Sequence, residues 1–207
     1  MEPCIPSGSA NFEPCEQMRI GIIDGHPDGD PARFCHAVAD AYADGARQVG
    51  HEVRLLRLAD LDFPILQDRN TWEAPHACPD LAAAQALVAW AEHLVIVHPL
   101  WLGTEPARLK ALLEQMFRPG FAFRTGRAMT ARLTGRSAHI IVTMGMPAPV
   151  YRFWFGAHGL KALKRNILAF VGIRPIRDTL IGDIEGLTQE GRKGWLSSIK
   201  ALGARGR

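Results

Sequence analysis

The chain has 207 residues, of which 47% are apolar and 22% are charged, and its net charge is +3. A chain of this length and balance can bury a large core as one domain, which argues against an intrinsically disordered protein. No apolar run approaches the roughly 18 residues that cross a bilayer, so no integral membrane segment is expected. No repeat of about 20 to 50 residues indicates a solenoid.

Cysteine usage and the first residues indicate the compartment and the domain boundary. The chain has four scattered cysteines with no C-x-x-C pair among them: Cys4, Cys15, Cys35 and Cys78. Neither a zinc ribbon nor a disulfide framework is indicated, and a reducing cytoplasm fits best. Residues 1–17 lack the basic start and apolar stretch of a secretory signal. We expect a disordered extension over 1–17 and one domain over 18–207, with Met18 as an alternative translation start.

Charge is distributed unevenly along the chain. Residues 115–177 contain eleven basic side chains and no acidic one, so this segment carries +11 against +3 for the whole chain. Such polarity favours a face that meets an anion, for example a phosphorylated cofactor; a solvated basic face is the alternative. No zinc finger, RNP-like sequence or basic heptad repeat accompanies the charge, so nucleic acid is not an expected partner.

The first quarter of the chain predicts a strand, a helix and a second strand. Residues 19–24 form an apolar run, and Asp30 followed by Pro31 indicates an N-cap with proline at the first helical position. The helix has one apolar stripe, which consists of Phe34, Val38, Tyr42 and Val49. Gly50 ends this pattern, and residues 51–58 then alternate as a strand.

The rest of the chain continues the alternation of helices and strands. The patterns predict helices over 80–91, 106–117, 159–172 and about 188–201, and strands over 93–99, 137–145 and 173–182. Pro175 favours an edge position or a late start for the last strand. Five such strands predict an α/β fold with a parallel sheet covered on both faces, in the order 2-1-3-4-5.

Ligands of such a sheet bind beyond the carboxyl ends of its first, third and fourth strands. Three segments follow these ends: loop one (24–33), loop two (98–106) and loop three (143–158). Loop one is neither a G-x-G-x-x-G fingerprint nor a Walker loop, which disfavours an ordinary dinucleotide site or an NTPase. His26 is in reach of a phosphate oxygen at the following helix N-terminus, with Arg33 and Phe34 nearby; a histidine satisfied by backbone is the alternative. The loop's acidic residues are assigned to turn formation and capping.

Loops two and three offer aromatic and hydrogen-bonding groups. Pro99 bends the chain after an apolar strand, so that the next backbone amides can bond a planar heterocycle. Trp101 supplies an aromatic contact, or packs in the core. The aromatic cluster of loop three is a core or dimer contact if taken alone, while Tyr151 and His158 offer a hydroxyl and an imidazole to an aromatic substrate.

The segments 98–123 and 143–159, with the HPD turn at 26–28, resemble the flavodoxin-like NAD(P)H:quinone oxidoreductases. The likeness covers about residues 18–200, and its most specific part is P-L-W-x-x-x-x-P-A-x-L-K-x-x-x-x-x-x-F-x-x-G-F-A-F. It implies a flavodoxin-like three-layer sandwich, a tightly held flavin (FAD rather than FMN), and NAD(P)H as cosubstrate. It also implies ping-pong hydride transfer to a quinone, in a homodimer whose interface completes each site. An azo- or nitro-compound reductase, or a regulatory subunit of an ion-efflux system, is the alternative.

The resemblance also assigns residues to roles. Those matching the flavin-binding stretches are His26, Phe34 and Cys35 in and after loop one, Pro99, Leu100, Trp101 and Leu102 in loop two, and Thr143, Met144, Gly145 and Met146 in loop three. Tyr151 and His158 match the tyrosine and histidine that face the quinone. Amides near Leu100 to Leu102 are expected to stabilise charge on the ring. No metal is expected, because the other histidines lack ligand spacing: His36, His51, His76, His93 and His139 are interpreted as surface or satisfied side chains.

Overall fold

The computed structural model describes residues 17–74, 78–126 and 129–206. Its centre is a five-stranded parallel sheet in the order β2-β1-β3-β6-β7. The strands are β1 (Arg19–Asp24), β2 (Glu52–Arg57), β3 (His93–Pro99), β6 (Ser137–Thr143) and β7 (Ile176–Ile181). The predicted order 2-1-3-4-5 is confirmed, because β6 and β7 are the fourth and fifth strands of this sheet. The extension expected over 1–17 and the side chain of His76 lie outside the described residues, apart from Gln17.

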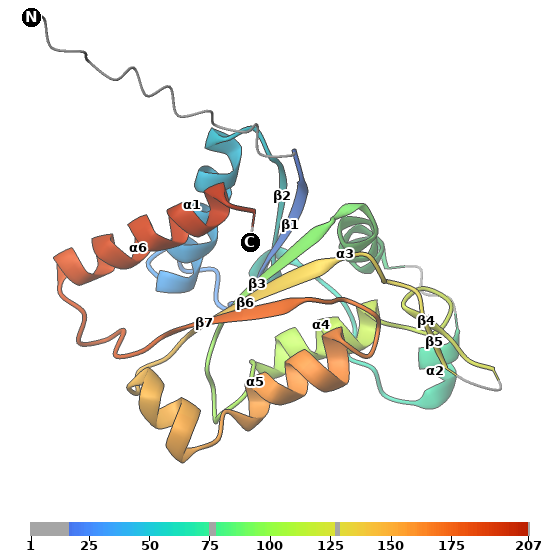
Figure 1. Cartoon of the computed structure of the whole chain (residues 1–207). Helices are drawn as coiled ribbons and strands as arrows, with labels where there is room; N and C mark the ends of the chain where they lie inside the picture. The colour runs from blue at the N-terminus through green and yellow to red at the C-terminus, as the bar shows by residue number, and fades with distance from the viewer. Residues whose placement is uncertain (1–16, 75–77, 127–128, 207) are drawn as a thin grey trace, which may run out of the picture.

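Helices cover both faces of the sheet (Figure 1). One face carries α1 (Phe34–Gln48) and α6 (Gln189–Ala204), and the other carries α3 (Pro79–Trp90), α4 (Ala107–Met116) and α5 (His158–Ala162). Each strand contributes alternate side chains to the two cores, so that Ile22 packs on the α1 side and Ile23 on the α3 side. No helix within the described ranges is both long and apolar enough to cross a membrane.

The first layer depends on close contact between α1 and α6. A Cβ atom built on Gly203 would lie 2.1 Å from the carbonyl oxygen of Tyr42, and one on Gly45 would lie 1.9 Å from that of Lys200. Both distances are far below what real Cβ atoms show, so only glycine permits this helix spacing.

A small subdomain-like addition lies beside α4 and was not predicted. It contains the short helix α2 (Arg69–Glu73) and a two-stranded antiparallel ribbon of β4 (Phe123–Arg124) and β5 (Thr130–Ala131). The rings of Trp72 and Phe123 are 6.0 Å apart and join the two parts. Strands of two residues are too short to produce a period-2 pattern, which is why the sequence does not reveal them.

Several predicted boundaries are corrected by the structure. Helix α1 begins at Phe34, capped by the backbone of Arg33, instead of at Pro31. Asp30 accepts the N–H of Ala32, so it forms a turn ahead of the helix as an Asx turn does. Val49 is not part of the buried stripe, since it follows the last helical turn and is 45% exposed.

The carboxyl-terminal half follows its pattern more closely. The helix predicted over 159–172 begins one residue earlier, at His158, and continues after α5 as a π-helical segment over Leu163–Leu168. Strand β7 lies at the sheet edge and begins directly after Pro175, so both expectations for this proline are confirmed. Helix α6 runs to Ala204, with Thr188 as its N-cap.

Candidate active site

Loop one is anchored by a buried carboxylate at the end of β1. Asp24 has no exposed surface, and its oxygens accept from Arg57 Nη1 at 2.8 Å and from the His26 N–H at 3.3 Å. His36 Nδ1 lies 2.5 Å from Asp24 Oδ2, while its Nε2 lies 2.9 Å from the carbonyl oxygen of Asp28. Both partners are acceptors, so both contacts are hydrogen bonds only when each ring nitrogen carries a proton. This network fixes the loop from beneath.

The network was missed by sequence reasoning, which interpreted His36 as a surface or simply satisfied side chain. Arg57 also donates to Asp40 at 2.7 Å, so charges from β1, β2 and α1 are linked in one chain of contacts. A signal was present in the sequence: Asp24 ends an otherwise apolar strand, and a buried carboxylate requires partners.

His26 lies on this loop, and its ring is held by the backbone of Asp28. Its Nδ1 lies 3.1 Å from the Asp28 nitrogen and 3.2 Å from the Asp28 carbonyl oxygen, so the ring tautomer decides whether Nδ1 accepts from the first or donates to the second. Burial is the main cause that lowers the pKa of His26, so the neutral ring is favoured. The ring meets that of Trp101 edge-on, with centroids 6.0 Å apart. Loops one and two therefore touch.

Two further cationic side chains, besides Arg57, lie near loop one. Arg33 pairs with Asp28 at 2.7 Å and with Asp30 at 3.6 Å, so the loop's own acids partly neutralise it. Arg192, on α6, holds its guanidinium 5.3 Å from the ring centre of Phe34. Arg192 was not predicted as a site residue, because it follows β7, well outside the three loops.

Loop two ends in a tight turn that projects toward solvent. Trp101 and Thr104 exchange two backbone hydrogen bonds around Leu102 and Gly103, whose φ angles are 48° and 86°. This is a type I′ turn, and a leucine in the left-handed region costs roughly 1–2 kcal/mol. Leu102 is fully exposed and Trp101 is 48% exposed. A strained, exposed apolar residue of this kind indicates a functional position.

The expectation for the amides of loop two is only partly met. The Leu100 N–H donates to the carbonyl oxygen of Thr143 at 2.8 Å, and the Trp101 N–H donates to that of Thr104 at 2.9 Å. Both amides are therefore used inside the protein and do not face a ligand. Within the described residues, the N–H groups of Leu102 and Gly103 have no backbone acceptor. Pro99 is buried and ends β3.

Loop three is joined to loop two by Tyr151. Its side chain is almost fully buried; the hydroxyl donates to the carbonyl oxygen of Gly103 and accepts the Leu160 N–H, each at 3.2 Å. Burial is the main cause that raises the pKa of Tyr151. A Cβ atom on Gly159 would lie 2.3 Å from the Gly103 oxygen, so loop two is in direct backbone contact with the first turn of α5, immediately after loop three.

Tyr151 and His158 line one cavity of about 440 Å³. Its other walls are Leu102, Gly103, Thr104, Met146, Phe155 and Gly159. His158 is exposed, begins α5 and lies against Gly156, where a Cβ atom would be 2.8 Å from its Nε2. The two predicted substrate-facing residues are thus brought together.

The remaining predicted residues cluster where β6 ends. Cys35 Sγ lies 3.0 Å from Thr143 Oγ1, and burial raises the pKa of the Cys35 thiol to about 12. Cys35 is therefore a packing residue and not a thiolate. Met144 is buried, while Gly145 is exposed beside Glu185, whose Oε1 would be 3.5 Å from a Cβ atom on Gly145. Glu185 was not predicted either.

The donor set at this edge suits a flat ring that carries a phosphate. Polar and cationic groups gather near loop one, in His26, Arg33 and Arg192, and loop two adds the Trp101 side chain and the Leu102 and Gly103 amides.

Comparison with known proteins identifies the class to which this arrangement belongs. The family described as having a flavodoxin-like fold matches residues 18–201, so the chain belongs to this family. A ribosyldihydronicotinamide dehydrogenase-like protein of Penicillium crustosum is 26% identical over 62% of the chain, and the chain spans only 58% of that protein. An uncharacterized NAD(P)H oxidoreductase of Haemophilus influenzae is 25% identical, over 83% of the chain and 87% of that protein.

Solved structures share the fold at lower identity. An NAD(P)H:quinone oxidoreductase of Methanothermobacter marburgensis superposes with a TM-score of 0.78 at 18% identity, over 91% of this chain and 98% of that one. An FMN-dependent NADH-azoreductase of Bacillus anthracis, solved with FMN, gives a TM-score of 0.71 at 16% identity, over 91% and 99% of the two chains. The predicted flavodoxin-like fold is confirmed.

Proposed function

We propose that this protein is a flavin-dependent NAD(P)H:quinone oxidoreductase that works by two-electron, ping-pong hydride transfer. One observation carries the proposal: the three loops at the carboxyl edge of the sheet converge. Trp101 of loop two touches His26 of loop one, and Tyr151 of loop three is hydrogen-bonded to Gly103 of loop two. A ligand at this edge is therefore in reach of all three loops.

Several side chains are proposed to hold the flavin. In the tautomer that carries its proton on Nε2, His26 donates to the flavin phosphate, supported by the charges of Arg33 and Arg192, while Trp101 contacts the ring. Bound flavin supplies the redox chemistry, taking a hydride from NAD(P)H and passing two electrons to the acceptor. The structural neighbour solved with FMN supports FMN as the cofactor, in place of the FAD favoured by the sequence.

His158 is proposed as the group that polarises the acceptor oxygen. It is exposed at the cavity, whereas the hydroxyl proton of Tyr151 is used by Gly103. Tyr151 is therefore proposed to position loop two. Its hydroxyl could donate to a substrate only after breaking its hydrogen bond to Gly103. Removing one donor of this type typically costs about 10² in rate.

A homodimer is proposed to cover the cavity. Leu102 and Phe155 line the cavity and are exposed, and the two residues that directly precede Phe155 in the chain, Phe153 and Trp154, are 81% and 85% exposed. Isolated monomers rarely present such a cluster to water, so a second subunit is the proposed cover. Light scattering is expected to give the mass of two chains, and replacing Trp154 with a charged residue is expected to lower it.

The experiment that tests the function is an activity assay on purified protein. We expect yellow protein that oxidises NADH or NADPH with a quinone, and faster turnover with quinones than with azo dyes. The reverse ratio would favour the azoreductase alternative. The His158→Gln variant should lose activity while keeping its flavin, and Arg124→Gln, an exposed change elsewhere, should lose neither. Negligible turnover together with co-purification of a membrane protein would favour the regulatory alternative.

A further inference from the structure

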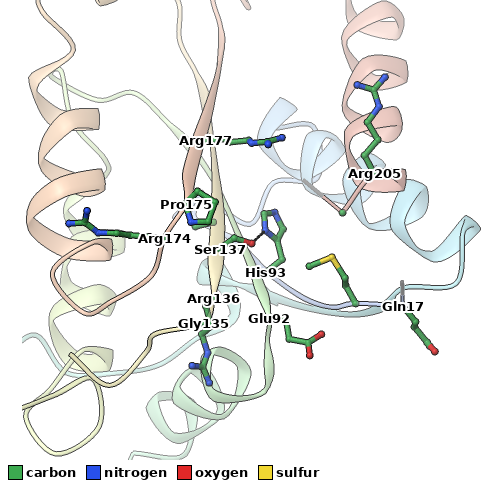
Figure 2. A pocket seen from close by; sticks show the side chains of 13 residues that line it. Gln17, Glu92, His93, Gly135, Arg136, Ser137, Arg174, Pro175, Arg177 and Arg205 are labelled. Atoms are coloured by element: carbon green, nitrogen blue, oxygen red, sulfur yellow. Dashed lines mark hydrogen bonds between the residues drawn. The ribbon is translucent and has the colours of Figure 1, made fainter. Parts of the chain in front are cut away.

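A second cavity lies at the opposite edge of the sheet from the three loops. It has a volume of about 830 Å³ and lies at the amino ends of β3, β6 and β7 (Figure 2). Its polar walls are Glu92, His93, Arg136, Ser137, Arg174, Arg177 and Arg205. The proposed oxidoreductase chemistry takes place at the carboxyl edge, so that chemistry has no use for this cavity.

The side chains on one face of the sheet change from apolar to polar toward this cavity. On the face that packs against α1 and α6, its carboxyl half is apolar, with Ile22, Val97 and Ile181 in the core. At the amino ends, the same alternation presents His93, Ser137 and Arg177. Apolar residues at these amino-end positions would stabilise the sheet more, because buried polar groups cost free energy unless they are partnered.

One buried side chain of this floor is incompletely partnered. His93 is 2% exposed, and its Nδ1 lies 2.7 Å from Ser137 Oγ. Its Nε2 has no hydrogen-bond partner within the described part of the chain. Burial is the main cause that lowers the pKa of His93 to about 4, and the positive charge of Arg177 adds to it. An anion bound in the cavity would offset the positive charge of Arg177 that His93 experiences.

The basic segment at 115–177 supplies part of the wall. Several basic side chains of this segment have partners within the protein. Arg118 donates to the carbonyl oxygen of Ala74, and Arg152 and Lys164 pair with Asp178. Arg136 likewise donates to the carbonyl oxygens at the end of α3. These contacts account for much of the charge that the sequence assigned to an anion-binding face.

Three arginines of the cavity have no such role. Arg174, Arg177 and Arg205 form no ion pair with any residue in the described ranges. Figure 2 shows Arg177 reaching from β7 toward the side where His93 and the end of α6 with Arg205 lie, while Arg174 points to the other side of β7. The one acidic residue of the wall, Glu92, is already paired with Arg19 at 3.1 Å. The unpaired charge here is therefore positive.

We propose that this cavity binds a small phosphate-bearing anion between Arg177 and Arg205, above His93. Guanidinium groups pair with phosphate oxygens through charge-assisted hydrogen bonds. The cavity volume falls within the roughly 300–1,000 Å³ of small-molecule sites, which admits a phosphorylated metabolite as well as free phosphate. Binding here would be separate from the flavin and the nicotinamide.

The test is calorimetric titration of the flavin-loaded protein with inorganic pyrophosphate and, in a second arm, with a mononucleotide, at constant ionic strength. We expect saturable binding, and at least about a tenfold loss of affinity in Arg177→Gln and in Arg205→Gln, as for other charge-assisted contacts. The matched control Arg124→Gln removes the same charge at an exposed position of the same basic segment and should bind as the wild type.

A second readout does not depend on the arginine variants. The ring signals of His93 in an NMR titration should shift as pyrophosphate binds. Tighter binding of the mononucleotide than of pyrophosphate would identify an organic phosphate as the ligand, and the opposite order would identify an inorganic phosphate compound such as pyrophosphate. Absence of saturable binding, or an equal loss in all three variants, would overturn the proposal. The flavin content and activity of the variants should be unchanged, so failure here leaves the proposed function untouched.

Discussion

The contact between loop two and the first turn of α5, directly after loop three, can be tested with a single methyl group. In Gly159→Ala the new Cβ atom would lie 2.3 Å from the Gly103 oxygen and 2.8 Å from Thr104 Cα. Both neighbours are backbone atoms, so no side-chain rotation relieves the overlap. Since real Cβ contacts are not shorter than 3.0 Å, the loops must separate by at least the missing 0.7 Å (3.0 − 2.3). The Tyr151 hydroxyl bond to Gly103 lies beside this contact and would lengthen.

We expect two consequences of different size. Overpacking of this kind destabilises a protein by about 1–3 kcal/mol, which urea unfolding measures. Activity should fall further, because a displacement of about 1 Å at a positioning contact can cost about 10² in rate. The matched control is Gly194→Ala, a helical glycine of α6 with nothing within 4 Å, which should be neutral or stabilising. If Gly159→Ala behaves like Gly194→Ala in both measurements, the assigned contact between the loops is wrong.

Three further predictions concern single side chains. Tyr151→Phe removes both hydrogen bonds of the hydroxyl and leaves a buried N–H unpaired, so urea unfolding should show a loss of about 1–3 kcal/mol; an unchanged midpoint would argue against the bridge. Because burial raises the pKa of Cys35 to about 12, mass-mapped alkylation of native protein should modify Cys35 much more slowly than the partly exposed Cys78, and equal rates would contradict its packing role. Burial lowers the pKa of His98 from 6.5 to about 4, so the unfolded chain binds its proton first as the pH falls. The free energy of unfolding should therefore fall as the pH drops from 6.5 to about 4, by at most about 3 kcal/mol from this group. Unfolding measured at several pH values should show a smaller fall in His98→Leu than in the wild type.

The main sheet was predictable because its strands leave a strong signal. β1, β3 and β6 are buried on both faces and form apolar runs, and the rule of right-handed crossovers then restricts their order. The position of the candidate site follows from that order, since loops one, two and three lie at the carboxyl edge. Strand and helix patterns do not indicate a flavin, and only the family resemblance of loops two and three pointed to one.

What could not be predicted depends on contacts between distant segments. Asp24, His36 and Arg57 belong to three elements, and only the folded sheet brings them together. Likewise, nothing local shows that the Leu100 amide is used by another carbonyl, because its partner, Thr143, is on another strand. The start of α1 was misplaced because Asp30 uses its side chain in a turn, which competes with capping.

Flavin binding by the three loops is the property on which the proposed function depends. The most direct measurement is a fluorescence titration of flavin-free protein with FMN and with FAD, followed by mass analysis of the flavin released from native protein. We predict saturable binding with one flavin per chain, weakened in Trp101→Ala and in Gly159→Ala and unchanged in Gly194→Ala. If neither flavin binds the wild-type protein, or if the loop variants bind as tightly as it does, the three loops are not the flavin site.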